Sequence, residues 1–332
     1  MPNSNNRGHT VPSSEAQPKL LLVSSAADLG KGCHFNQYKI TGADPTLVDG
    51  TVYISNADHD KPLPLILYVF GNGQPASNFE VRDGAVFAGR FSLHHYFEEL
   101  ALHRARIMVV DNAGVRFADQ SWDYRRGTLD APTSFREIHT FPNWINLLKS
   151  AIEAAWQEPW IDKSKTLVCG HSDGASVVAR LAEVLPGISH VAPLAGAGLC
   201  HLLFFELSKQ EAFCDGLDRV LQELVRGMQS NPNSIDSFYN GLTYRFWTSG
   251  WLFLSDFESL ARSSARIYAA HGTADPNSPI QGFDFMCAGL KTMSKDLIVE
   301  RVEGADHGFC TAGSSEPGFR AILSNVLRWF LD

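Results

Sequence analysis

Short apolar runs alternate with helix-compatible stretches over most of this 332-residue chain. Continuous apolar runs of this kind are typical of strands that are buried on both faces of a parallel sheet. They predict strands at residues 65–70, 106–110, 166–169, 190–194, 265–270 and 297–302. The stretches between and after them predict helices near 92–103, 143–157, 175–184 and 318–331. The alternation predicts an α/β fold with a mostly parallel, doubly wound sheet, which binds ligands at the carboxyl ends of its strands.

Three regions depart from this alternation. Residues 1–18 are rich in Asn, Ser and Pro, which predicts a disordered tail. Residues 19–60 predict an antiparallel entry into the sheet, with strands at 19–23, 37–40 and 51–55. The extra length at about 199–257 predicts a mostly helical insertion. The chain is therefore expected to form one domain, 19–332, that carries this insertion.

The composition is that of an ordinary globular protein. The 28 basic and 36 acidic residues give a formal net charge of −8, which disfavours nucleic acids and anionic membranes as partners. No apolar run approaches the roughly 18 residues of a membrane span, and the first residues lack the pattern of a signal peptide. The six cysteines have no C-x-x-C spacing, so we expect free thiols and a cytoplasmic location. The oligomeric state does not follow from the sequence.

The most informative motif is G-x-S-x-G, which occurs as Gly170-His171-Ser172-Asp173-Gly174. It follows a predicted strand and precedes a predicted helix, so Ser172 lies at the top of a sharp turn that only small neighbours allow. This context predicts an exposed serine nucleophile, with the N–H of Asp173 directed at a developing oxyanion. His171 is expected to pack rather than react. The alternative is a strand-to-helix turn that happens to contain a serine.

A serine nucleophile needs a base and a group that orients the base. Downstream, His271-Gly272-Thr273-Ala274-Asp275-Pro276 and Gly304-Ala305-Asp306-His307-Gly308-Phe309 each follow a predicted strand. We expect Asp275 to be the orienting acid, with Asp256 or Asp284 as alternatives, and His307 to be the base. The His94-His95 pair and His103 lack metal-ligand spacing and H-E-x-x-H is absent, so no metal site is expected.

Together the three motifs resemble the nucleophile, acid and histidine loops of the α/β-hydrolase superfamily. The resemblance is closest to its dienelactone-hydrolase and prolyl-oligopeptidase-like branches, and it covers residues 63 to 332. It implies an α/β-hydrolase fold and a serine hydrolase in which Ser172 attacks, His307 moves the proton and Asp275 holds the imidazole. It implies no metal and no organic cofactor.

The loop after strand 65–70 reads Gly71-Asn72-Gly73. In the family that it resembles, a His-Gly-type loop donates the second oxyanion N–H here, but Phe70 takes the place of the usual histidine. We expect the N–H of Asn72 to be the donor, with Gly71 or Gly73 as alternatives. The same loop also fits the dinucleotide pattern G-x-G-x-x-A. Pro75, which lacks an N–H, and the late acidic residue Asp111 count against a dinucleotide site.

We therefore expect a hydrolase that cleaves a carboxylic ester of a small acyl substrate through an acyl-enzyme intermediate. A peptidase or amidase is the alternative, and a thioesterase would use the same three residues. A non-catalytic ligand-binding protein of the same fold is a remote alternative, because all three residues are present. The insertion is expected to cap the active site, and Trp247, Trp251 and the loop residue Trp122 to line a substrate pocket. These aromatic residues could instead simply pack the cap onto the core.

Overall fold

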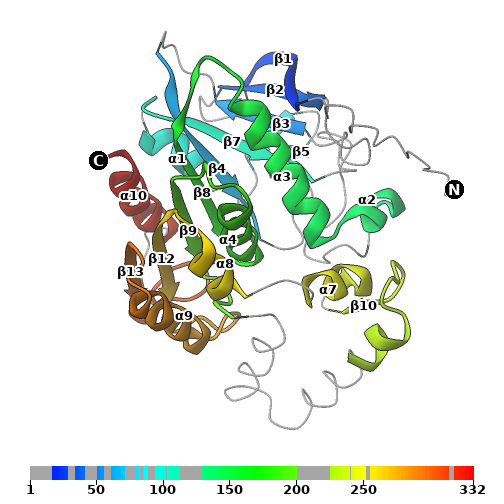
Figure 1. Cartoon of the computed structure of the whole chain (residues 1–332). Helices are drawn as coiled ribbons and strands as arrows, with labels where there is room; N and C mark the ends of the chain where they lie inside the picture. The colour runs from blue at the N-terminus through cyan, green and yellow to red at the C-terminus, as the bar shows by residue number, and fades with distance from the viewer. Residues whose placement is uncertain are drawn as a thin grey trace, which may run out of the picture.

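The computed structural model describes residues 17–28, 34–41, 51–55, 61–71, 79–82, 85–88, 94–101, 103–112, 129, 131–199, 225–239, 241–251, 255–313 and 318–332. A nine-stranded sheet forms the centre of the molecule, in the order β1-β2-β3-β7-β4-β8-β9-β12-β13 (Figure 1). The predicted tail lies outside the described residues up to position 16.

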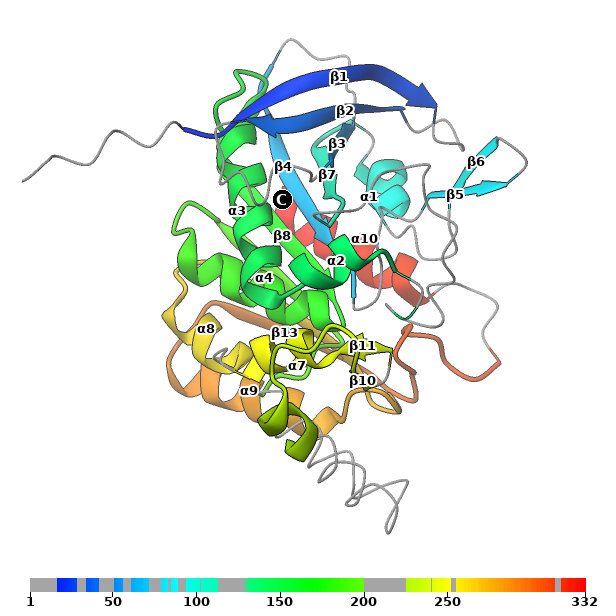
Figure 2. The ribbon, with the colours of Figure 1, turned by 90° about the vertical axis from the view of Figure 1, so that its right-hand side faces the viewer.

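The sheet has a parallel part and an antiparallel part. Its parallel strands are β7 (Arg106–Val110), β4 (Leu63–Val69), β8 (Ile161–His171), β9 (His190–Leu194), β12 (Arg266–Gly272) and β13 (Leu297–Val302). The antiparallel strands β1 (Lys19–Asp28), β2 (His34–Thr41) and β3 (Thr51–Ser55) extend it at one edge. Figure 2 shows the sheet running from β1 and β2 at the top to β13 at the bottom. The predicted doubly wound sheet with an antiparallel entry is confirmed.

Alternate residues of each central strand enter two separate cores. In β4, Leu65 and Leu67 pack on one side while Ile66 and Tyr68 pack on the other. Helices α3 (Phe141–Ala155), α4 (Asp173–Val184), α8 (Asp256–Arg262) and α9 (Ile280–Thr292) contribute to the first core. Helices α1 (His94–Ala101) and α10 (Gly318–Leu331) contribute to the second. Burial on both faces explains why these strands are continuous apolar runs.

The region of the predicted insertion is only partly described. It contains a helical turn at 225–230, the short hairpin of β10 (Phe238–Tyr239) and β11 (Leu242–Thr243), and α7 (Tyr244–Trp251). Residues 200–224 lie outside the described residues. A second hairpin, β5 (Phe79–Arg82) with β6 (Ala85–Ala88), and the short helix α2 (Thr133–Ile138) complete the described elements. Within the residues that the structure describes, no helix has the length and apolar character needed to span a membrane.

His139 joins α7 to the core. Its ring stacks between Phe135 of α2 and Phe246 of α7, at centroid distances of 4.5 and 4.7 Å. Arg136 adds hydrogen bonds to the carbonyl of Ile235 and to the carboxylate of Asp236, both at 3.1 Å. Burial lowers the pKa of His139 to about 3, against the opposing effect of the negative charge on Asp173. The imidazole is therefore neutral in the folded protein at neutral pH.

We expect His139 to make folding pH-dependent. In the unfolded chain a histidine takes up its proton near pH 6.5, whereas folded His139 does so near pH 3. Between about pH 6.5 and pH 3 the unfolded state therefore binds more protons than the folded state, and the free energy of unfolding falls as the pH drops through this window. Replacing His139 by Phe should reduce the loss of unfolding free energy between pH 7 and pH 5 by on the order of 1–2 kcal/mol, measured by urea denaturation.

The matched control is Phe135→Leu, which alters the same stack without removing a titratable group. It should lower stability by a similar amount at both pH values. A His139→Phe variant whose pH dependence equals that of the wild type would contradict the prediction.

Candidate active site

Ser172 sits between β8 and α4 in a conformation that is unusual for a serine. Its backbone has φ of 59° and ψ of −127°, a region that costs a residue with a side chain about 1–3 kcal/mol. Two hydrogen bonds anchor this turn: the Ser172 N–H donates to the Leu194 carbonyl at 3.0 Å, and the Ala175 N–H donates to the Ser172 carbonyl at 2.9 Å. The sharp turn predicted from G-x-S-x-G is therefore present.

The two glycines of the motif are required by close backbone packing. A β-carbon on Gly174 would lie 2.4 Å from the Phe70 carbonyl oxygen at the end of β4, and one on Gly170 would lie 2.1 Å from the Gly174 carbonyl oxygen. Both distances are shorter than any van der Waals contact, so a larger residue would move the turn. The requirement for small neighbours is confirmed.

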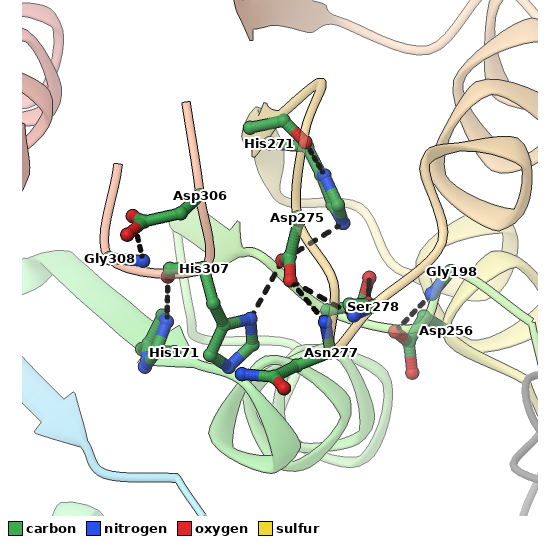
Figure 3. A network of polar contacts seen from close by, with 12 residues as sticks. His171, Gly198, Asp256, His271, Asp275, Asn277, Ser278, Asp306, His307 and Gly308 are labelled. Atoms are coloured by element: carbon green, nitrogen blue, oxygen red, sulfur yellow. Dashed lines mark hydrogen bonds and ion pairs between the residues drawn. The ribbon is translucent and has the colours of Figure 1, made fainter. Parts of the chain in front are cut away.

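The predicted acid and base meet beyond the ends of β12 and β13. The Nδ1–H of His307 donates to Oδ2 of Asp275 at 2.7 Å (Figure 3). The other oxygen of Asp275 accepts the N–H groups of Asn277 at 2.8 Å and Ser278 at 3.0 Å. These contacts hold the carboxylate in place and direct the Nε2 of His307 away from it. The pair thus has the geometry of a general base and its orienting acid.

The carboxyl group of Asp275 remains ionised in its buried position. Burial acts to raise its pKa, but the hydrogen bond and charge of His307 and the Asn277 N–H outweigh it, so that the pKa falls below its usual value. The carboxylate is therefore available to stabilise a positive charge on His307 at neutral pH.

The two alternative acids have other partners. Asp256 accepts the N–H of Gly198 at 3.0 Å, and Asp284 forms an ion pair with Arg301 at 3.5 Å. Asp306, the neighbour of the base in sequence, accepts the N–H groups of Gly308 and Cys310, both at 2.9 Å. It shapes the histidine loop instead of orienting the imidazole. Of these carboxylates, Asp275 is the one that contacts His307.

The serine and histidine loops contact each other through His171. Its Nε2 lies 2.9 Å from the carbonyl oxygen of His307, and the two rings are 4.6 Å apart. Within the described residues no hydrogen bond joins the Ser172 hydroxyl to His307. Such catalytic hydrogen bonds are often long before a substrate binds. The predicted nucleophile and base thus belong to adjacent loops at one end of the sheet.

Of the predicted oxyanion residues, Asp173 and Gly71 both lie next to Ser172. Asp173 begins α4, where the N-terminal N–H groups and the helix dipole favour an anion. Gly71 lies against the serine, because a β-carbon on it would be 2.9 Å from the Ser172 β-carbon. Asn72 and Gly73 lie outside the described residues, as do Ala76 and Pro75 of the dinucleotide pattern.

His271 was not anticipated by sequence reasoning as part of this site. Its side chain is fully buried, its Nδ1–H donates to the Gly272 carbonyl at 2.8 Å, and its Nε2 lies 3.9 Å from Oδ2 of Asp275. Burial lowers its pKa, so it is neutral beside the acid. The contacts of His171 were also missed. The His171 contact could not be inferred from the chain, because it depends on where two separate loops meet. His271 lies only four residues before Asp275 on the same segment, and this spacing is the signal that could have suggested their proximity.

The predicted pocket residues fall in different places. Trp247 is buried beside Phe246, and its indole N–H donates to the Tyr239 carbonyl at 2.9 Å. Trp251 is the last residue of α7, and Trp122 lies outside the described residues. A role for these residues in a substrate pocket stays a prediction. Within the described part of the chain, no three His, Cys, Asp or Glu side chains gather as a metal site.

Comparison with known proteins identifies the fold. No protein-family model matches the chain, and no curated protein sequence matches it. Acetyl xylan esterase from Paenibacillus sp. R4 superimposes with a TM-score of 0.58 at 12% identity, over 95% of this chain and 89% of that one. Est1E from Butyrivibrio proteoclasticus, in a structure with ferulic acid bound, gives a TM-score of 0.53 at 14% identity, over 93% and 98%.

A peptidase shares the same architecture. Acylaminoacyl peptidase from Pyrococcus horikoshii superimposes with a TM-score of 0.53 at 14% identity, over 96% of this chain. The present chain spans 42% of that longer protein. At these identities the likeness concerns the fold. The chain has the α/β-hydrolase fold, which it shares with the acetyl xylan esterase, Est1E and acylaminoacyl peptidase structures.

Proposed function

We propose that the protein is a serine hydrolase that cleaves carboxylic esters through an acyl-enzyme intermediate. The observation that carries the proposal is the His307–Asp275 pair, joined at 2.7 Å, beside a serine held at positive φ. Ser172 attacks the carbonyl carbon while Nε2 of His307 takes its proton. Asp275 stabilises the imidazolium, which then protonates the departing alcohol. Water activated by His307 releases the acid and restores the serine.

The tetrahedral intermediate needs donors for its oxyanion. We propose the N–H of Asp173 as the first donor, because it begins α4 immediately after the nucleophile. The second comes from the loop that follows β4, where Gly71 touches Ser172 and Asn72 is next along the chain. Two such donors lower the energy of the developing charge more than that of the substrate.

The choice of an ester over other acyl substrates has chemical and structural support. Esters are cleaved more easily than amides by this chemistry, and an acetyl xylan esterase is among the similar structures. A peptidase or amidase is the second candidate, since an acylaminoacyl peptidase has the same fold. A thioesterase would use the same catalytic residues. A ligand-binding protein without activity would keep the fold but would have no use for the ionised Asp275.

We also propose that residues 199–257 form a cap within a single domain that spans residues 19–332. The support is the attachment of α7 to α2 and α3 through His139, Phe141 and Phe246. Ser249 of α7 accepts the N–H of Phe141 at 3.1 Å, which fixes α7 at the start of α3. A cap fastened in this way would limit which acyl groups reach the serine.

The nucleophile can be tested with a fluorophosphonate probe. Labelling should occur at Ser172 and be abolished in Ser172→Ala, with hydrolysis of an aryl ester reduced by up to about 10⁶-fold. His307→Ala should lose a comparable amount, and the double variant should be little worse than either, because the residues act as one unit. Mass spectrometry of the labelled peptide and steady-state kinetics provide the measurements. An active Ser172→Ala variant, or losses that multiply in the double variant, would contradict the mechanism.

The oxyanion loop can be tested by two neighbouring substitutions. Gly71→Val should lower turnover by about 10²–10³-fold, because the new side chain collides with Ser172 and displaces the loop. Asn72→Ala should have a much smaller effect if only its N–H is used. The opposite ranking would make the Asn72 amide side chain the donor. Calorimetric binding of NAD that Gly71→Val abolishes would instead support the dinucleotide interpretation.

The cap can be tested at Trp247. Trp247→Ala should change the order in which acyl and aryl groups are hydrolysed, while labelling of Ser172 by a small probe persists. Trp247→Phe is the matched control, because it retains an aromatic ring while it removes the hydrogen bond to Tyr239. An unchanged ranking in Trp247→Ala, measured with an ester panel, would show that this residue only packs α7 onto the hairpin.

A further inference from the structure

His171 connects the nucleophile to the base. It is the last residue of β8 and directly precedes Ser172. Its Nε2 lies 2.9 Å from the backbone carbonyl oxygen of His307, from the opposite loop (Figure 3). Because a carbonyl can only accept, Nε2 carries the proton and donates it. One side chain thus ties the backbone of the base to the residue next to the serine.

Packing fixes the orientation of this donor. The His171 ring lies 4.6 Å from the ring of His307 and 4.6 Å from that of Phe319, which meets it edge-on from α10. Phe319 is in turn packed against Phe309 of the histidine loop at 5.2 Å. The ring therefore cannot rotate freely, and its N–H stays aimed at the His307 carbonyl.

His171 also remains uncharged beside the base. Burial and the nearby His307 together lower its pKa to about 3, against the opposing effects of the hydrogen bond to the His307 carbonyl and of Asp275. A neutral ring neither repels the imidazolium that forms on His307 nor competes for the serine proton. The group has the properties of a fixed support and not of a second base.

We propose that His171 is a positioning residue that sets the distance between the Ser172 hydroxyl and the His307 imidazole. The proposal rests on the serine hydrolase function proposed above. The two groups must come within hydrogen-bond reach for the proton to move, and a displacement of about 1 Å in such a pair can lower the rate by about 10²-fold. The tie from His171 limits that displacement, since its two ends are attached to the nucleophile and to the base.

A pair of substitutions separates this role from simple packing. His171→Phe keeps an aromatic ring and removes the donor, whereas His171→Gln loses the ring and can place an amide N–H near the position of Nε2. The control is His190→Gln, which alters a buried histidine at the amino end of β9, packed on Trp329 and Phe330, away from Ser172. The measurements are kcat and KM for an aryl acetate, the rate of Ser172 labelling by a small fluorophosphonate, and the melting temperature.

We expect His171→Phe to lower kcat and the labelling rate by about 10–100-fold with little change in KM. His171→Gln should recover most of the loss, and His190→Gln should retain wild-type rates. Wild-type rates in His171→Phe, or equal losses in folded Phe and Gln variants, would overturn the proposal. If His171→Phe does not fold, His171→Leu takes its place as the variant without a donor.

A spectroscopic measurement separates failure of this proposal from failure of the proposed function. The Nδ1–H of His307, bonded to Asp275, should give a downfield proton resonance that weakens in His171→Phe and returns in His171→Gln. If the probe does not label Ser172 in the wild-type protein, the hydrolase function is refuted. The resonance would still test whether the hydrogen bond from His171 positions His307. A resonance unchanged in all variants would show that His171 does not position His307.

Discussion

A single strained residue, Ser172, determines the layout of the site. Its positive φ makes the sharp turn from β8 into α4 at a single residue. Such a turn exposes the serine side chain at the carboxyl end of the strand. This conformation is stable only because Gly170 and Gly174 let the backbones touch and because the Ser172 N–H is held by Leu194 of β9. The strain is thus balanced by the pairing of β8 with β9, where Cys169 and Leu194 are fully buried.

The parallel sheet brings the other two residues to the serine. Asp275 and His307 are 32 residues apart and far from Ser172 along the chain, yet each follows the carboxyl end of a strand. Because β8, β9, β12 and β13 are neighbours and run in the same direction, their carboxyl ends form one edge. The loops that leave this edge meet without any need for long connections. The site is therefore a consequence of strand order, and the side chains supply its chemistry.

The sequence was informative wherever burial on both sides constrained the residue types. Strands 106–110 and 190–194 are fully buried and have the predicted bounds, because their apolar runs reveal them directly. Helix 318–331 also has the predicted bounds because of its apolar face, and so does the edge strand 297–302, although its residues are only half-buried or exposed. Helix α9 was not predicted, since Gly282 and Gly289 weaken its local preference. A β-carbon at these positions would come within 2.3 Å of the Ala197 carbonyl oxygen and 2.6 Å of the Phe257 ring. Close packing thus requires the glycines and maintains the helix.

The same distinction applies to the histidines of the site. The position of His307 after a strand made its hydrogen bond to Asp275 predictable in outline, whereas the contact of His171 with His307 depends on where two loops meet. His271 lies four residues before Asp275 on the same segment. The His271 ring is fully buried and His171 is partly buried, and this loss of contact with water lowers the pKa of each and keeps both neutral. The charge state matters because Nε2 of His271 lies 3.9 Å from the same Asp275 oxygen that His307 binds at 2.7 Å. A protonated His271 would compete for that carboxylate oxygen. Because His171 and His271 are neutral, neither competes for the Asp275 carboxylate, which remains hydrogen-bonded to His307, the residue that we propose as the base.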